Sequence, residues 1–118
     1  MELIGLKKCS TCREVEEILN INNIQYTYRE INVDNPNADE LEKWYLESGE
    51  NSTKKLVNTS GMKYKELGLK DKWDQLDQVS QFDLLATDGM LVKRPILLTD
   101  EGDIYIGATV KKYLATLA

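Results

Sequence analysis

Cys9-Ser10-Thr11-Cys12 is the stretch that decides the fold. It holds both cysteines of the chain, and it lies where a short apolar run, Leu3-Ile4-Gly5-Leu6, meets an amphipathic segment. At such a junction between strand and helix, the amino end of the helix stabilises the thiolate of Cys9, and Cys12 is near enough to close or resolve a disulfide. The stretch therefore predicts redox or thiol-transfer chemistry.

Two other interpretations of the cysteine pair are weaker. A structural disulfide between residues three apart would remove little entropy from the unfolded chain, compared with a disulfide that closes a long loop. A closed tetrahedral zinc site needs four ligands, whereas this chain offers two cysteines and no histidine. The absence of histidine also excludes Cys–His nucleophilic catalysis and histidine general-base chemistry. We therefore expect no metal site.

The composition predicts one globular domain of 118 residues. The hydrophobic content of 42% and the charged content of 30% are ordinary for a globular protein. The net charge of −5 argues against direct binding to nucleic acid, because neutralising phosphates requires a clustered basic face. The lysines at 7–8, 54–55 and 111–112 form pairs and no longer run, and we interpret them as solvated surface.

The start of the chain bears on its location. Met1-Glu2-Leu3-Ile4 enters an apolar strand directly and lacks the charged and apolar regions of a signal peptide. No apolar stretch approaches the roughly 20 residues of a transmembrane helix. A dithiol without an export signal is typical of a reducing cytoplasm, where such pairs are usually catalytic or sensing. We therefore expect a cytoplasmic protein with no membrane partner.

Hydrophobic periodicity predicts a βαβ unit at the start of the chain. A strand at 2–6 leads into a helix over about 11–22, for which Thr11 and Glu14 are candidates for a capping box. A second strand over 25–31, rich in Tyr, Thr and Ile, should lie parallel to the first through a right-handed crossover.

The rest of the chain predicts a helical segment, a hairpin and a final helix. Gly49 should end the first of these helices, and the reversal after residue 99 is a tight turn. The final helix should turn four side chains to the core, namely Val110, Tyr113, Leu114 and Leu117. The predicted elements are a helix at 38–48, short helices near 53–57, 64–67 and 80–86, strands at 95–99 and 104–106, and a helix at 109–117.

This order predicts the fold class. A βαβ unit, a helical insert over about 36–90 and a ββα unit make an α/β protein with a mixed four-stranded sheet. Two parallel strands followed by an antiparallel hairpin, with a CxxC motif opening the first helix, are typical of the thioredoxin-like fold. We expect a single domain over residues 1–118.

The sequence resembles the ArsC/Spx group of thioredoxin-like proteins over nearly its whole length. Within that group it is most similar to the small arsenate-reductase-like, glutaredoxin-like proteins. The similarity is carried, in order, by Lys8-Cys9-Ser10-Thr11-Cys12-Arg13, by Asn58-Thr59-Ser60-Gly61-Met62-Lys63-Tyr64-Lys65-Glu66-Leu67-Gly68-Leu69-Lys70, and by Asp88-Gly89-Met90-Leu91-Val92-Lys93-Arg94-Pro95-Ile96.

The resemblance implies roles for several residues. Cys9 would be the nucleophile, Arg94 would contact a bound oxyanion or thiol partner, and Pro95 would be a cis-proline facing the dithiol. The charge of an arginine is fixed, so it can lower the pKa of a thiolate and grip an oxyanion through two hydrogen bonds. The alternatives are a surface salt bridge for Arg94 and an ordinary proline at the start of a strand for Pro95. Arg13 is a candidate for holding either an acidic side chain or a substrate.

Two departures from the family pattern affect the expected reaction. Arsenate reductases of this type use three arginines around the oxyanion, and this chain has Asn58 at the first position and Ile106-Gly107 at the third. A doubly charged oxyanion would therefore lose much of its charge-assisted binding. Cys12, in contrast, supplies a resolving thiol that single-cysteine arsenate reductases lack. Both departures favour general thiol–disulfide chemistry over arsenate reduction.

The leading hypothesis is a small dithiol oxidoreductase. Cys9 attacks a disulfide, a glutathione adduct or an oxyanion, and Cys12 resolves the product. We expect no bound cofactor, with glutathione, thioredoxin or glutaredoxin as electron donor. One alternative is an Spx-like redox regulator that binds the α subunit of RNA polymerase, and another is a true arsenate reductase.

Overall fold

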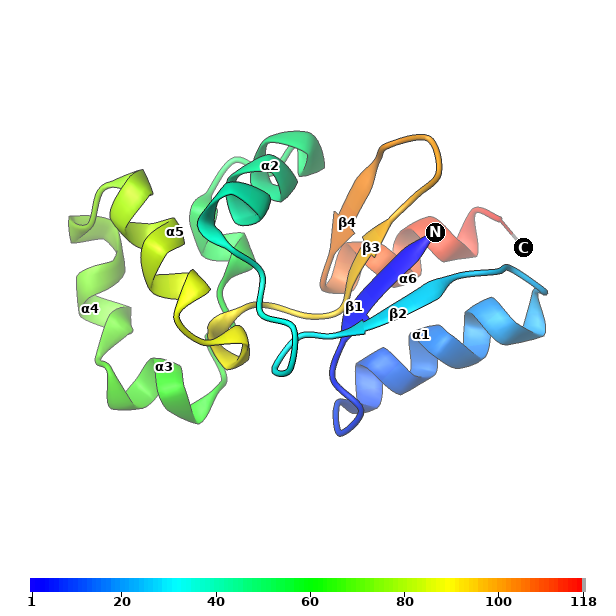
Figure 1. Cartoon of the computed structure of the whole chain (residues 1–118), viewed down its shortest axis with the longest axis horizontal. Helices are drawn as coiled ribbons and strands as arrows, with labels where there is room; N and C mark the ends of the chain where they lie inside the picture. The colour runs from blue at the N-terminus through cyan, green and yellow to red at the C-terminus, as the bar shows by residue number, and fades with distance from the viewer. Residues whose placement is uncertain (118) are drawn as a thin grey trace.

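Four short strands form one mixed sheet in the order β2-β1-β3-β4 (Figure 1). The computed structural model of the chain describes residues 1–117. Strand β1 (Glu2–Gly5) pairs in parallel with β2 (Thr27–Glu30) and antiparallel with β3 (Ile96–Leu98). Strand β4 (Ile104–Ile106) pairs antiparallel with β3, which completes the predicted hairpin. The predicted α/β class and mixed four-stranded sheet are confirmed.

Helices lie between these strands and after them. One helix, α1, connects β1 to β2, and a group of helices and short 3-10 turns separates β2 from β3. Within residues 1–117 they are α1 (Ser10–Ile21), α2 (Ala38–Ser48), η1 (Thr53–Leu56), α3 (Met62–Glu66), α4 (Leu69–Lys72), η2 (Trp73–Gln75), α5 (Gln78–Ala86), η3 (Gly89–Leu91) and α6 (Ala108–Ala115).

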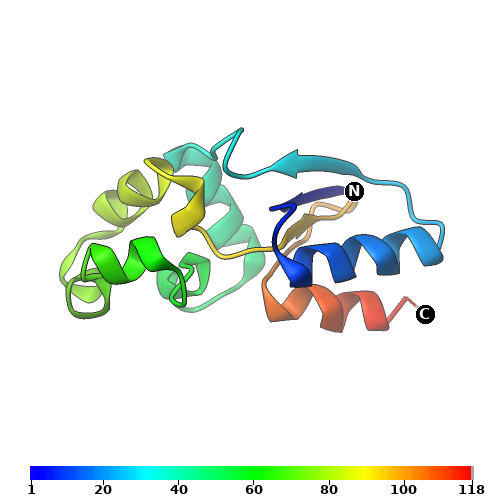
Figure 2. The same cartoon turned by 90° about the horizontal axis from the view of Figure 1, so that it is seen from below.

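The two faces of the sheet bury different helices. Helices α1 and α6 lie side by side on one face, where both begin at the end of the sheet nearest the helical group (Figure 2). Alternation along each strand divides the core, because successive side chains point to opposite faces. The α1–α6 face buries Leu3, Val15, Leu19, Leu97, Val110 and Leu114. The opposite face buries Ile4, Ile96, Ile104 and Ile106 against the helical group, including Leu41, Trp44 and Trp73.

The helical group extends beyond the end of the sheet, so the molecule measures 43 × 27 × 22 Å (Figure 1). Its two ends meet at Gly89, whose backbone N–H donates to Oδ1 of Asn35 at 2.8 Å. A β-carbon on Gly89 would overlap the carbonyl oxygen of Ile31, so this approach requires glycine. The chain therefore returns from the helical group at the point where it left the sheet.

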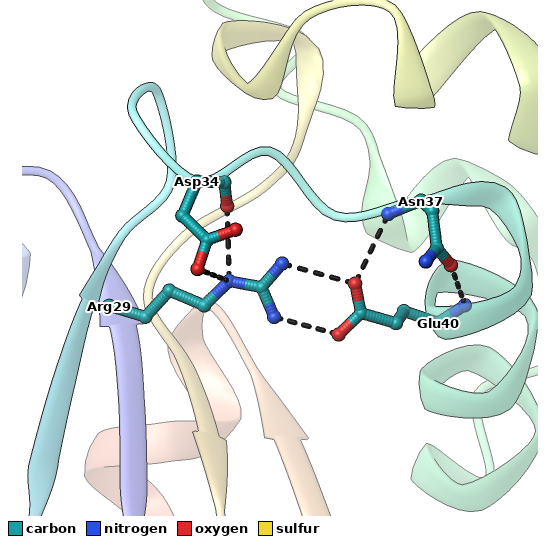
Figure 3. A network of polar contacts seen from close by, with 4 residues as sticks. All are labelled: Arg29, Asp34, Asn37 and Glu40. Atoms are coloured by element: carbon teal, nitrogen blue, oxygen red, sulfur yellow. Dashed lines mark hydrogen bonds and ion pairs between the residues drawn. The ribbon is translucent and has the colours of Figure 1, made fainter.

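Arg29 joins the sheet to α2 (Figure 3). Its guanidinium donates to both carboxylate oxygens of Glu40, at 2.7 and 3.1 Å, and its Nε donates to the backbone oxygen of Asp34 at 3.0 Å. The same guanidinium lies 5.6 Å from the centre of the Trp44 ring. Glu40 also forms a capping box with Asn37 at the start of α2. This network fixes the orientation of the first insert helix.

Several boundaries differ from the predictions. Helix α1 begins at Ser10 and is capped by Cys9, so the predicted Thr11–Glu14 capping box is wrong. Leu117 is 47% exposed because α6 ends at Ala115, so it does not belong to the core-facing stripe. Strands β2 and β3 are shorter than predicted, and α4, η2 and η3 were not predicted at all. The assignment of a single domain with an insert over about 36–90 stays a prediction.

Candidate active site

Cys9 caps the amino end of α1. Its backbone is extended, with φ −80° and ψ 117°, and its Sγ accepts a hydrogen bond from the backbone N–H of Cys12 at 3.3 Å. The turn before it is closed by the Cys9 N–H, which donates to the carbonyl oxygen of Leu6 at 2.9 Å. Cys9 is half-buried and lies at the positive end of the helix dipole. Both cysteines are free thiols.

Cys12 lies in the first turn of α1 and is 1% exposed. Burial raises the pKa of its thiol to about 12, and the hydrogen bond with Cys9 acts in the same direction. The positive charge of Arg94 opposes this increase in pKa, which locates Arg94 near the dithiol. The two cysteines therefore occupy different environments, with one sulfur accessible at the helix end and the other protonated beneath it.

Gly5 leaves the space that Cys12 fills. A β-carbon on Gly5 would lie 3.0 Å from Sγ of Cys12 and 3.5 Å from the hydroxyl oxygen of Tyr28. The Tyr28 hydroxyl donates to Oε1 of Glu30 at 3.1 Å, and the same oxygen accepts the backbone N–H of Lys7 at 2.8 Å. The Tyr28 hydroxyl and the buried thiol thus both lie against Gly5, and Glu30 accepts the hydrogen bond of that hydroxyl.

Arg94 and Pro95 form the segment that leads into β3. The peptide bond between them is cis, as the family resemblance implied, and Pro95 is buried. Nη1 of Arg94 donates to the carbonyl oxygens of Val92 and Met90 at 3.2 and 3.4 Å. Its Nε is buried and has no hydrogen-bond partner among residues 1–117. Arg94 therefore keeps donor capacity that the fold does not use.

Two other positions singled out in the sequence differ in their exposure to solvent. Arg13 is exposed and forms no ion pair within residues 1–117. Asn58 is half-buried, and its amide donates to the carbonyl oxygen of Met90 at 3.4 Å. The carbonyl oxygen of Met90 thus accepts hydrogen bonds from both Asn58 and Arg94, so these two positions lie close together.

A cavity of about 500 Å³ lies between the η1 segment and the start of α6. Its lining includes Lys54, Lys55 and Lys93, opposed by Glu50. None of these lysines has a carboxylate within 4.0 Å among the described residues. Ala108 and Thr109, the first two residues of α6, also line the cavity. Three lysines therefore line one cavity of a chain whose net charge is −5.

Sequence reasoning missed two features of this site. The lysine pair at 54–55 predicts solvated surface, and Lys55 is indeed exposed and Lys54 half-buried, but the pattern does not show that both line the cavity, which η1 forms with α6. Tyr28 and Glu30 were treated only as residues of a strand. Their spacing of two places both on one face of β2, and this alternation was the available signal. The side of the strand that faces Cys12 depends on tertiary packing, which the pattern does not specify.

Comparison with known proteins gives a family match and close structural neighbours. The ArsC family matches residues 4–116. The chain is similar to an ArsC-family-related protein from Bacteroides fragilis, with 40% identity, a TM-score of 0.87 and coverage of 96% of this chain and 95% of the other. It is also similar to a possible arsenate reductase from Streptococcus mutans, with 42% identity, a TM-score of 0.82 and coverage of 91% and 89%.

Curated relatives extend the comparison. The uncharacterized protein YusI of Bacillus subtilis is 42% identical over 100 residues, which cover 85% of this chain and 83% of YusI. The global transcriptional regulator Spx 1 of Oceanobacillus iheyensis is 30% identical over 99 residues, which cover 84% of this chain and 72% of the regulator. Within residues 1–117 no helix combines the length and the apolar character that crossing a membrane requires.

Proposed function

The chain belongs to the ArsC family, and on that premise we propose that it is a small dithiol oxidoreductase. The observation that carries the proposal is the unequal placement of the two sulfurs, with Cys9 as the cap of α1 and Cys12 buried below it. An accessible sulfur at a helix end suits attack on a substrate. A second thiol three residues on suits resolution of the product.

The reaction has two displacement steps. The Cys9 thiolate attacks one sulfur of a substrate disulfide, a Cys9–substrate disulfide forms, and the other half of the substrate leaves as a thiolate. The Cys12 sulfur then attacks Cys9, the Cys9–Cys12 disulfide forms, and the second thiolate leaves. The substrate gains two electrons, and the protein dithiol loses them. A thiol donor such as glutathione, thioredoxin or glutaredoxin would return the protein to its reduced state.

Charge near the dithiol supports an anionic partner. Nε of Arg94 has no hydrogen-bond partner within residues 1–117, and Lys54, Lys55 and Lys93 line a cavity beside the start of α6. Glutathione adducts carry carboxylates, which such cations would attract. We therefore propose glutathione-linked disulfides as a substrate class ahead of uncharged disulfides.

Two cysteine variants test the proposal. Cys9→Ser should abolish turnover of a glutathione-linked disulfide, because it removes the attacking sulfur. Cys12→Ser should leave the first attack intact and accumulate a mixed disulfide on Cys9, visible as a mass increase of one glutathione unit. Turnover that survives Cys9→Ser would reject the proposal. A mixed disulfide found on Cys12 in the Cys9→Ser protein would reverse the two roles.

The similarity to Spx 1 favours a second candidate, a redox-sensing regulator that binds the α subunit of RNA polymerase. The same dithiol would then act as a switch rather than in turnover. A pull-down with the α subunit, on the reduced and the oxidised protein, tests this directly. Binding in neither state would reject the regulatory function.

The similarity to a possible arsenate reductase keeps arsenate as a third candidate. Asn58 and Ile106-Gly107 occupy positions at which the resemblance implies arginines, so we expect weak use of a doubly charged oxyanion. Turnover of arsenate should be compared with that of a small disulfide, using glutathione with glutaredoxin and then thioredoxin as donor. Faster turnover of arsenate would place arsenate reduction first.

A further inference from the structure

The proposed reaction requires Cys12 to lose a proton that its surroundings retain. Burial keeps the Cys12 thiol protonated, with its pKa raised to about 12. Burial is the first cause of this increase, and it persists when Cys9 is held in a mixed disulfide, so the neutral Cys12 thiol stays favoured in the resolving step. Resolution of a mixed disulfide on Cys9 needs that thiolate as its nucleophile. A nearby group that accepts the proton would remove this obstacle.

Tyr28 and Glu30 are placed to accept it. Gly5 has no side chain, so Sγ of Cys12 and the hydroxyl of Tyr28 lie on the same small volume, 3.0 and 3.5 Å from where a β-carbon would be. The Tyr28 hydroxyl already donates its proton towards Oε1 of Glu30 at 3.1 Å. The hydroxyl oxygen that lies against Gly5 together with Sγ of Cys12 is therefore the one whose own proton is directed to Glu30.

We propose that Tyr28 and Glu30 form the path by which the proton of Cys12 leaves during the resolving step. The Cys12 proton passes to the Tyr28 oxygen while the Tyr28 proton passes to the Glu30 carboxylate. The Cys12 sulfur attacks Cys9, the Cys9–Cys12 bond forms, and the substrate thiolate leaves with the electron pair of the broken bond. Glu30 then releases its proton to solvent. This inference rests on the function proposed above.

The charges around the path favour this direction. Burial and the hydrogen bond to Glu30 raise the pKa of Tyr28, so its hydroxyl stays neutral and relays a proton without ionising. Glu16 and Cys12 add smaller effects of the same sign on Tyr28. Arg94 is the cation that acts on Cys12, and it favours the transient thiolate.

The experiment separates the two displacement steps. A dithionitrobenzoate probe, an aromatic disulfide whose released thiolate is coloured, is mixed rapidly with an excess of reduced protein. The first coloured phase reports the attack by Cys9, and the second reports resolution by Cys12. Both phases are followed from about pH 7 to about pH 9 in the wild type, Tyr28→Phe and Glu30→Gln.

Tyr26→Phe is the matched control. Tyr26 donates to Oε1 of Glu16 at 3.1 Å, the same type of bond at the same length as that of Tyr28 to Glu30. The Tyr28 hydroxyl, in contrast to that of Tyr26, is one of the three atoms nearest to a β-carbon on Gly5. Glu30→Gln keeps an oxygen that can accept the Lys7 N–H, so the turn before Cys9 is retained. Thermal unfolding of each variant identifies any loss of fold.

The expected result is a second phase about 100-fold slower in Tyr28→Phe at pH 7, with the first phase unchanged. The second phase should be nearly independent of pH in the wild type. In both path variants it should rise about tenfold per pH unit, because direct ionisation of Cys12 takes over. Tyr26→Phe should match the wild type in both phases.

A normal second phase in folded Tyr28→Phe and Glu30→Gln would overturn the proton path while leaving the proposed function intact. So would a slower second phase that keeps the pH profile of the wild type, because that indicates a role in packing alone. Absence of the first phase from the wild-type protein would overturn the proposed function itself.

Discussion

Arg29 precedes the helical group in the sequence and Arg94 follows it, and the two arginines use their hydrogen-bond donors differently. The guanidinium of Arg29 donates hydrogen bonds to Glu40 and Asp34 and packs over the ring of Trp44. The Arg29 side chain is only 12% exposed. Arg94 reaches only two backbone carbonyl oxygens, and its buried Nε has no partner within residues 1–117. A fully paired arginine stabilises one arrangement of the chain, whereas an arginine with an unused donor is a candidate for binding a ligand. The difference separates a structural charge from a candidate functional one.

The largest expected effect is on stability at Arg29. Arg29→Ala should lower the free energy of unfolding by about 2 kcal/mol, because Glu40 loses its partner and Trp44 loses a packed neighbour. For a chain of this size that corresponds to a fall of about 8 °C in the melting temperature. Chemical and thermal unfolding measure both quantities.

Lys43→Ala is the control for Arg29→Ala. Lys43 and Glu47 are an exposed pair at 4.0 Å on α2, and loss of such a pair should cost less than about 0.5 kcal/mol. An equal effect of the two variants would mean that the Arg29 network contributes no more than a surface ion pair.

The second effect should be on catalysis at Arg94. Arg94→Ala should leave the melting temperature nearly unchanged and lower kcat/KM for glutathione-linked disulfides about tenfold, equivalent to ~1.4 kcal/mol of transition-state binding. Steady-state kinetics with an anionic and an uncharged disulfide measure the selectivity of this loss.

Arg13→Ala provides the matched comparison, since Arg13 is exposed and also lies in the first turn after Cys9. An equal loss with uncharged disulfides would show that Arg94 acts on the dithiol rather than on the partner. If Arg94→Ala unfolds the protein, Arg94 is structural in the same sense as Arg29.

The smallest expected effect is the pH dependence of the stability that the Arg29–Glu40 pair contributes. Hydrogen bonds from Arg29 hold the pKa of Glu40 below its ordinary value of 4.5. A lowered folded-state pKa contributes stability that is complete above pH 4.5 and is lost as the pH falls through the folded pKa. The stability difference between the wild type and Glu40→Gln should therefore be constant from about pH 7 to about pH 5 and narrow below about pH 4.5.

Urea unfolding of both proteins across this range measures the difference. The pKa of Asp77 is also lowered, by its hydrogen bonds to Ser80, and it titrates in the same window. Its contribution is common to the two proteins and cancels between them. A difference that stays constant down to about pH 3, well below the ordinary carboxyl value, would mean that Glu40 is unaffected by Arg29.

The sheet was predictable because each strand and each turn is recognised from a few consecutive residues. Alternation in Ile104-Tyr105-Ile106 gave the bounds of β4, and Gly49 ends α2 in a left-handed conformation as predicted. The start of α1 was placed one residue late because a cysteine is an unusual cap, and Thr11 has the commoner hydroxyl. Helix α4, which runs from Leu69 to Lys72, is too short to have a periodicity of its own.

The candidate site was predictable only in part for a related reason. The cysteine motif is recognised directly from the sequence by its spacing, and the family resemblance identified Arg94 and Pro95 as candidates. Tyr28, Glu30 and the lysine cavity depend on which segments meet in three dimensions. Gly5, which lies between Cys12 and Tyr28, is not distinguished in the sequence from other strand residues. The need for glycine there becomes visible only when its neighbours in space are known.

The closure at Gly89 has an evolutionary consequence. The chain leaves the sheet near Ile31, and Gly89 packs against the carbonyl oxygen of Ile31 where the chain returns. The segment between Ile31 and Gly89 is therefore a detour, that is, an insertion whose two ends are in contact. Lengthening or shortening a connection of this kind changes its closure entropy only slowly with the number of residues. Relatives can therefore gain or lose turns of helix in the detour, and so acquire new surfaces, while β1, β3 and the dithiol keep their positions.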